Sequence, residues 1–227
     1  MKQKSIVMLS GGLDSATCAA ISNDMGFDTF AISFDYGQKH KQELDFAKET
    51  AKSLGISKHI TAKCDLTVFG GSALTANIKI PKNKPKNEIG KQIPVTYVPA
   101  RNTIFLSLAL AWAETIGCFD IFIGVNNIDC SGYPDCKPEF IESYEKMANI
   151  AMSITKDSDK HLKIHTPLIN MNKKEIILKG ISLGVDYGKT ITCYDHKPQG
   201  ACGVCEACIL RLNGFKQAGI TDPCRYR

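Results

Sequence analysis

The sequence of 227 residues has no long hydrophobic run and little net charge. It contains no stretch of about 18 apolar residues, which excludes a conventional transmembrane helix. The chain begins Met-Lys-Gln-Lys-Ser and then turns apolar at once, which is not the pattern of a secretory signal peptide. Its net charge of +5 suits acidic small ligands but provides no concentrated basic face. We therefore expect a cytoplasmic protein with small-molecule partners and no stable nucleic-acid or membrane partner.

Glycine and serine come together directly after the apolar run 5–9, in the segment Ser10-Gly11-Gly12-Leu13-Asp14-Ser15. Glycine has no side chain, so the backbone can turn tightly here and approach an anion closely. A helix that begins after such a turn directs its free N–H groups and the positive end of its dipole at the same point. The segment lacks the lysine of a Walker A motif. It predicts a polyphosphate site, in which Asp14 would support the Mg²⁺ that arrives with a nucleotide, or the helix start.

The pattern Ser-Gly-Gly-x-Asp-Ser resembles the pyrophosphate loop of the ATP-pyrophosphatase superfamily. This resemblance implies that ATP is the substrate and is cleaved between its α and β phosphates, with the loop holding the leaving pyrophosphate. The plain alternative is a Gly-Ser turn without a ligand. The nucleotide contacts that the resemblance implies run from the strand end into the first helical turns: Met8, Leu9, Ser10, Gly11, Gly12, Leu13, Asp14, Ser15, Ala16, Thr17 and Cys18.

Short apolar strands alternate with helices along the chain, which predicts parallel pairing and right-handed crossovers. The fold class is therefore α/β, an open parallel sheet flanked by helices, Rossmann-like and similar to the adenine nucleotide alpha hydrolases. Ligands of such sheets bind beyond the carboxyl ends of the strands. The predicted strands are 5–9, 29–35, 59–62 and 120–125, and the predicted helices are 16–25, 41–54, 101–116, 138–154, 173–183 and 208–218.

Four of the ten cysteines cluster near the end of the chain as Cys193, Cys202, Cys205 and Cys208. Thiolates at this spacing can surround one ion in a closed tetrahedral site, which predicts one structural Zn²⁺ per chain. An iron–sulfur cluster also takes four cysteines, and unpaired core thiols are the plainest alternative. We expect a nucleotide-binding α/β domain over 1–188 and a small zinc-binding subdomain, packed on it, over 189–227.

Residues 78–91 form the one conspicuous irregular stretch, with five lysines and two prolines. Such a segment cannot pack a core, and we expect a mobile loop. It is either a solvated tether or a lid whose lysines screen phosphates.

Further motifs are Asp35-Tyr36-Gly37-Gln38 after the second predicted strand, Val98-Pro99-Ala100-Arg101-Asn102 at the start of the predicted helix 101–116, Gly124-Val125-Asn126 at the end of the strand 120–125, and the segment 129–136. Together with the loop and the four cysteines, they resemble the family of 7-cyano-7-deazaguanine synthases of queuosine biosynthesis. The resemblance implies a carbon–nitrogen ligase that converts 7-carboxy-7-deazaguanine, ammonia and ATP into the nitrile through adenylated acid and amide intermediates. AMP and pyrophosphate are released, and the family suggests a homodimer. The alternatives are a pyrophosphate-loop enzyme that thiolates tRNA and an ATP-sensing module.

Within this interpretation, Asp14, Ser15 and Arg101 are the expected catalytic residues. The planar fork of Arg101 would hold the substrate carboxylate or the α phosphate, the alternative being a surface salt bridge. A carboxylate should read the N–H donors of the deazaguanine edge, and a tyrosine could stack on the ring. The expected substrate contacts are Tyr36, Gln38, Arg101, Asn102, Asp129, Ser131, Tyr133 and Asp135.

Overall fold

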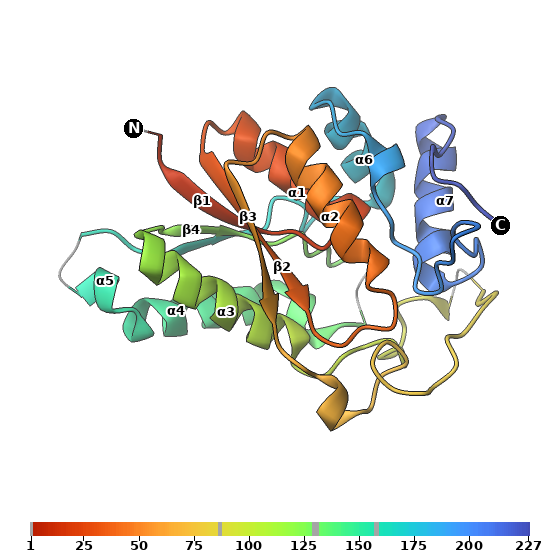
Figure 1. Ribbon diagram of the computed structural model, residues 1–227, viewed down its shortest axis with the longest axis horizontal. Coiled ribbons are helices and arrows are strands. Elements are labelled where there is room, and N and C mark those ends of the chain that lie inside the picture. Colours follow the sequence, from red (N-terminus) through yellow and green to blue (C-terminus); the bar gives the residue numbers. More distant parts are fainter. Residues whose placement is uncertain (1, 86–87, 129–131, 157–158) are drawn as a thin grey trace.

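Five parallel strands form one sheet in the order β3-β2-β1-β4-β5, which confirms the predicted fold class (Figure 1). The computed structural model describes residues 2–85, 88–128, 132–156 and 159–227. The strands are β1 (Lys4–Met8), β2 (Asp28–Asp35), β3 (Lys58–Lys63), β4 (Asp120–Phe122) and β5 (Lys163–His165). β2 and β4 pair with β1 on opposite sides, and the chain runs from β1 through β2 and β3 before it returns to β4. The strand order therefore reverses beside β1, and the carboxyl end of β1 is the natural ligand position.

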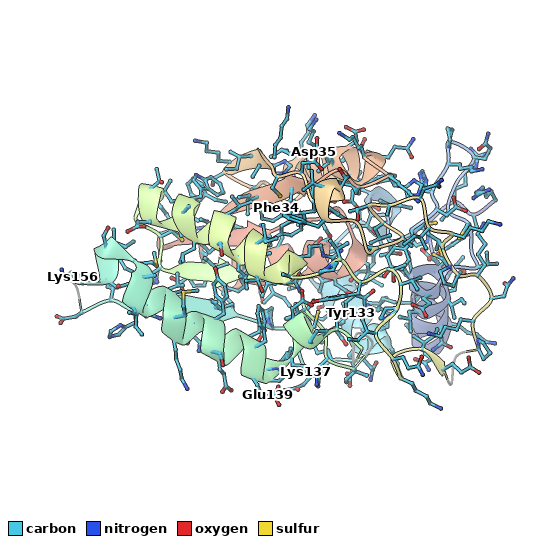
Figure 2. The ribbon with its side chains drawn as sticks, turned by 90° about the horizontal axis from the view of Figure 1, so that it is seen from below. Phe34, Asp35, Tyr133, Lys137, Glu139 and Lys156 are labelled. Carbon is cyan, nitrogen blue, oxygen red and sulfur yellow. The ribbon has the colours of Figure 1, made fainter. Side chains whose placement is uncertain are left out.

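Helices cover both faces of the sheet. One face carries α1 (Leu13–Asp24), α2 (Gln42–Ser53) and α6 (Lys173–Ser182), with α7 (Glu206–Ala218) packed on α6. The other face carries α3 (Arg101–Ile116), α4 (Pro138–Ala151) and the short α5 (Ser153–Lys156). Figure 2 shows the second layer from outside, with Lys156 at one end and Tyr133 toward the other.

Alternation along β1 builds two separate cores. Ile6 and Met8 pack with the layer of α3 and α4, whereas Val7 and Leu9 pack with α1 and α6. All four side chains are buried. A strand buried on both faces reads as a continuous apolar run, which is why β1 was predictable from the sequence.

Three elements differ clearly from the sequence prediction. β4 ends at Phe122 rather than at 125; Ile123 N still donates to His165 O at 3.0 Å, and residues 123–126 line the cavity described below. β5 was not predicted, because it has only three residues and its two outer residues, Lys163 and His165, are polar. The predicted helix 138–154 is interrupted at Met152, whose backbone is extended, with ψ 131°.

The carboxyl-terminal segment has a small core of its own, built from the four cysteines with Ile191 and Ala201. It is joined to the loop 10–15, because Ile191 N donates to Gly11 O at 2.9 Å. Arg211 is fully buried on α7 and forms a two-pronged ion pair with Asp222, with both N–O distances 2.9 Å. None of the helices in the described ranges combines the length and apolar character needed to span a bilayer.

Part of the lysine-rich stretch docks on this segment. The Lys82 ammonium lies 2.8 Å from the carboxylate of Asp195, and Lys84 lies 2.8 Å from Glu206. Asn83 N also donates to Val204 O at 2.8 Å. The expectation of a free tether is therefore wrong for residues 82–84, because the acidic partners come from a distant part of the chain.

Candidate active site

A cavity of about 300 Å³ lies at the carboxyl ends of β1 and β2, where the fold class predicts a ligand. Its wall is built from several elements that are far apart in the sequence. They are the loop and the start of α1 (Ser10, Gly12, Leu13, Asp14, Ser15), the end of β2 and the start of α2 (Phe34, Tyr36, Gln38, Gln42, Glu43), the start of α3 (Arg101, Asn102, Phe105), the segment 123–126, Lys173 of α6, and residues 191–194 and 196 with Arg211.

Gly11 and Gly12 shape the loop in different ways. Gly11 has φ +79°, and a Cβ there would lie 2.3 Å from the carbonyl oxygen of Glu43, so only glycine fits. Gly12 has an ordinary φ of −84° and precedes α1 without a side-chain cap. A Cβ there would lie 3.3 Å from Ser10 Oγ and 3.6 Å from Ile191 O, so it would meet a side chain that can shift before it meets backbone. The loop therefore packs against α2 through Gly11 and faces the cavity through Gly12.

The two serines of the loop hydrogen-bond to each other. Ser10 Oγ lies 3.0 Å from Ser15 Oγ, which also donates to Gly12 O at 3.0 Å. Both hydroxyl groups line the cavity together with the first turn of α1. A helix N-terminus with hydroxyl donors beside it is a favourable position for a phosphate group.

Not every predicted nucleotide contact lines the cavity. Met8, Leu9 and Leu13 do, beside the polar loop residues, whereas Gly11, Ala16, Thr17 and Cys18 do not. The hydroxyl of Thr17 donates to Leu13 O at 3.0 Å and pairs with Tyr187 Oη at 2.7 Å. Cys18 is fully buried, which raises the pKa of its thiol. Within this structure, residues 16–18 serve the packing of α1.

Asp14 is paired with a lysine that the sequence analysis missed. Lys173 Nζ donates to both carboxylate oxygens of Asp14 at 2.8 Å. The two residues are 159 positions apart, and both line the cavity. A predicted helix start at 173 was the only signal for the lysine. The pair places a positive charge beside the loop, where a polyphosphate would need it.

Arg101 enters the cavity from the start of α3. Ala100, the residue before it, has φ +54°, a left-handed conformation that is strained for alanine. Burial tends to lower the pKa of Arg101, but Tyr36, Tyr133, Tyr194 and Asp135 outweigh it and raise that pKa. The guanidinium is thus permanently charged inside a cavity otherwise rich in apolar surface, and not on the outer surface.

A hydrogen-bonded group joins β2 to α2 on the opposite wall. Gln38 accepts from Tyr36 N at 2.8 Å and donates to Phe34 O at 3.0 Å and to the Glu43 carboxylate at 2.9 Å. Burial raises the pKa of Glu43 to about 7, although Arg101 and Gln38 favour the ionised form. Burial also raises the pKa of Tyr36 to about 12. Glu43 was not predicted; its place one turn beyond the Asp35–Gln38 motif was the available signal.

Of the remaining predicted substrate residues, one lines the cavity, two lie outside its lining, and two lie outside the described residues. Asn102 lines the cavity, and its amide donates to Asp135 O at 3.0 Å. The Asp135 carboxylate accepts from Asn102 N at 3.1 Å, so it supports the start of α3 and does not line the cavity. Tyr133 lies outside the lining and hydrogen-bonds Thr96 at 3.1 Å. Asp129 and Ser131 lie outside the described residues.

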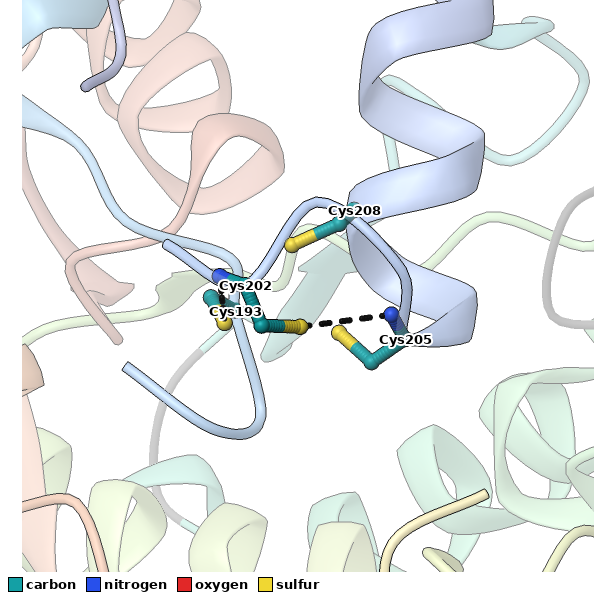
Figure 3. A group of neighbouring side chains, drawn as sticks. All are labelled: Cys193, Cys202, Cys205 and Cys208. Atoms are coloured by element: carbon teal, nitrogen blue, oxygen red, sulfur yellow. Dashed lines mark hydrogen bonds between the residues drawn. The ribbon is translucent and has the colours of Figure 1, made fainter. Parts of the chain in front are cut away.

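The four predicted ligand cysteines come together in one buried cluster (Figure 3). Their sulfur atoms all lie within 4.8 Å of one another. Four sulfurs about 2.3 Å from a zinc ion would lie about 3.8 Å apart, so the cluster fits a tetrahedral ion. Backbone N–H groups of Asp195 and Cys202 donate to Cys193 Sγ at 3.3 and 3.2 Å. Such donors stabilise thiolate charge, and the cluster can therefore hold a metal ion.

Comparisons with known proteins agree with one another. The family model described as "Queuosine biosynthesis protein QueC" matches residues 4–219. A 7-cyano-7-deazaguanine synthase of Citrifermentans bemidjiense is 58% identical over 228 residues, covering 100% of this chain and 99% of the relative. A protein of the same name from Desulfatibacillum aliphaticivorans is 57% identical over 226 residues, covering 99% and 97%.

Solved structures resemble the chain more distantly. A 4-thiouridine synthetase in complex with RNA and bound ATP has a TM-score of 0.54 and 18% identity, covering 88% of this chain and 44% of the other. A predicted tRNA methyltransferase subunit from Methanocaldococcus jannaschii has a TM-score of 0.50 and 21% identity, covering 79% and 74%. At such identities these likenesses concern the fold alone.

Proposed function

The chain belongs to the QueC family of queuosine biosynthesis proteins, and from this membership we propose that it is the ligase that makes 7-cyano-7-deazaguanine. The substrates are 7-carboxy-7-deazaguanine, ammonia and ATP, and the other products are AMP and pyrophosphate. The observation that carries the proposal is the full-length identity to synthases of this name, joined to a loop and cavity suited to polyphosphate.

The chemistry requires activation, because a carboxylate is a poor electrophile. Attack of a substrate oxygen on the α phosphorus makes an acyl adenylate, from which ammonia displaces AMP to give an amide. A second adenylation on the amide oxygen lets AMP leave again with formation of the nitrile. The protein's task is to position the reactants and to stabilise charge.

The residues of the cavity divide this task. Ser10, Gly12 and Ser15 would hold the pyrophosphate that leaves, with Lys173 adding positive charge. Arg101 would hold the substrate carboxylate or α phosphate through its planar fork. Both oxygens of Asp14 accept from Lys173, and their remaining lone pairs would hold the Mg²⁺ bound to ATP, which would neutralise phosphate charge there.

The substrate ring would lie toward the carboxyl end of β2. Tyr36, Gln38 and Asn102 line that part of the cavity and support this placement. Direct contacts from Asp129, Ser131, Tyr133 and Asp135 remain part of the proposal. Asp135 would need a free oxygen, since its Oδ2 accepts from Asn102 N at 3.1 Å.

We also propose that the four cysteines hold one structural Zn²⁺, because a closed set of four thiolates has no position for substrate. The subdomain boundary near 188 and a homodimeric assembly complete the proposal. Its site of action is the cytoplasm, where ATP is available and thiols stay reduced. Metal analysis of the purified protein and sedimentation equilibrium test the zinc and the dimer.

The decisive experiment supplies 7-carboxy-7-deazaguanine, ATP and ammonium and analyses the products by mass spectrometry. We expect the nitrile, AMP and pyrophosphate. ADP and orthophosphate as the nucleotide products would refute the proposal. The alternative of tRNA thiolation predicts instead AMP formation that depends on tRNA, and a fold likeness at 18% identity does not favour it.

A further inference from the structure

Two carboxylates line the cavity among the residues that the structure describes, Asp14 and Glu43. Both carboxylate oxygens of Asp14 accept a hydrogen bond from Lys173 Nζ. Glu43 receives one hydrogen bond within the described ranges, from Gln38 Nε2 to its Oε1 at 2.9 Å. Its second oxygen is left for a ligand, which distinguishes it from Asp14.

The position of Glu43 is fixed from two sides. Gln38 is buried and is itself held by Tyr36 N and Phe34 O, so the donor cannot turn away. The backbone of Glu43 packs against Gly11, the first glycine of the loop. Glu43 lines the cavity together with Arg101 and with Ser10 and Gly12 of the loop, and the charge of Arg101 acts on its carboxylate. A group held in this way can act on a substrate atom without further reorganisation.

Nitrile formation requires two protons to leave the substrate nitrogen. The amide carries two N–H hydrogens and the nitrile carries none. When the amide oxygen bonds to the α phosphorus and the bond to pyrophosphate breaks, one proton leaves and is carried away with pyrophosphate. When the C–O bond then breaks, AMP departs with the electron pair, the C–N bond becomes triple, and the second proton must be accepted.

We propose that Glu43 is a catalytic residue for this last step, its carboxylate accepting the proton from the imidate nitrogen as AMP departs. The proposal rests on the function proposed above and adds the group that handles the proton. The proton then passes from Glu43 to water when the product leaves the cavity.

The surroundings of Glu43 suit a base that works near neutral pH. With a pKa of about 7, the carboxylate is partly ionised there and is still a stronger base than an exposed glutamate. The other titratable groups that line the same cavity, among the described residues, are Arg101, Tyr36, Tyr194, Lys39, His40, His196, Cys136, Cys193, Asp14, Lys173 and Arg211. Burial lowers the pKa of His40 and His196, and the pKa of Tyr36 rises to about 12, so these groups titrate away from neutrality.

The test starts from the amide, 7-amido-7-deazaguanine, with ATP, so that the protonation of ammonia does not enter. Because the base must be ionised, the rate of nitrile formation by the natural protein should rise with pH through about 7. Glu43→Gln should lower kcat about 100-fold or more, change the KM values only a few-fold, and lose that rise. Glu43→Asp should keep the rise with an intermediate rate.

A matched control is Glu49→Gln, an exposed residue on the same helix, which should leave the rate and its pH dependence unchanged. Exchange of labelled pyrophosphate into ATP in the presence of the carboxylic acid should persist in Glu43→Gln, because adenylation of an acid releases no proton from nitrogen. That exchange also reports that the variant is folded.

Three outcomes would overturn the assignment. One is a kcat of Glu43→Gln within about three-fold of the natural rate. Another is an unchanged kcat with a KM for the amide raised about 100-fold, which would make Glu43 a reader of the purine edge. The third is loss of the exchange reaction together with nitrile formation. Failure of the function itself is separate, since the natural protein would then make no nitrile from acid, ATP and ammonium.

Discussion

Gly11→Ala should destabilise the protein far more than the loss of one glycine in an open position. The backbone there has φ +79°, which costs an L-residue about 1–2 kcal/mol. The new methyl group would also lie 2.3 Å from Glu43 O and 2.8 Å from Ala47 N, both backbone atoms of α2 that cannot rotate away. Overpacking of this kind costs about 1–3 kcal/mol. The sum is a loss of about 2–5 kcal/mol in the free energy of unfolding.

Gly26→Ala provides the control for the backbone term. Gly26 has φ +88°, but nothing lies within 4 Å of its Cβ position. Its loss should therefore be about 1–2 kcal/mol, and the difference between the two variants, about 1–3 kcal/mol, measures the contact of the loop with α2. Urea denaturation followed by circular dichroism gives both free energies. Equal values would refute the packing of Gly11 against α2.

Gly12→Ala separates folding from binding. Its φ of −84° is ordinary, and its nearest neighbour, Ser10 Oγ, would be 3.3 Å away. We expect stability within about 1 kcal/mol of the natural protein, but weaker ATP binding, because Gly12 lines the cavity and the methyl group would displace the hydroxyl of Ser10. Unimpaired ATP binding by Gly12→Ala in isothermal titration would contradict the position assigned to the phosphates.

Three further changes test other parts of the site. Lys173→Met should slow the cleavage of ATP to AMP and pyrophosphate about 100-fold or more, because it removes the positive charge held 2.8 Å from Asp14; a cleavage rate within five-fold of the natural protein would count against the assignment. Asp222→Asn should lower the free energy of unfolding by about 3–5 kcal/mol, since it leaves the guanidinium of Arg211 buried without its counter-charge, and an unchanged urea midpoint would argue otherwise. Cys205→Ser should lower the zinc content and the thermal stability together, which metal analysis and thermal melting would measure. Absence of zinc from the natural protein would contradict the proposed zinc site.

The features predicted correctly from the sequence depend on residues that lie close together along the chain. The loop at 10–15 is a local conformation, and the strands β1 and β2 are apolar runs with a clear period. The cysteine cluster is also nearly local, with three of its members within seven positions. In each case, residues close together in the sequence are enough to predict the local structure or the kind of site.

The features that were missed depend on contacts across the fold. Lys173 could not be recognised as a site residue because its partner, Asp14, lies 159 residues earlier. Glu43 could not be recognised because its pKa depends on burial and on the neighbouring Arg101 and Gln38. The lysines at 82 and 84 read as a solvated loop because Asp195 and Glu206, their partners, belong to a segment more than a hundred residues away. Charge in a sequence does not reveal whether it is paired, since pairing is a property of the tertiary structure.

One cysteine of the cluster, Cys193, also lines the cavity, so the cluster and the candidate site are in direct contact. Cys193 and Tyr194 line the cavity, and the segment that leads to them is held to the loop by the hydrogen bond from Ile191 N to Gly11 O at 2.9 Å. Closing the cluster on an ion therefore fixes one side of the site as well as the carboxyl-terminal fold. An ion that takes no part in the chemistry would then affect the rate, because its loss would release the part of the cavity wall formed by Cys193 and Tyr194.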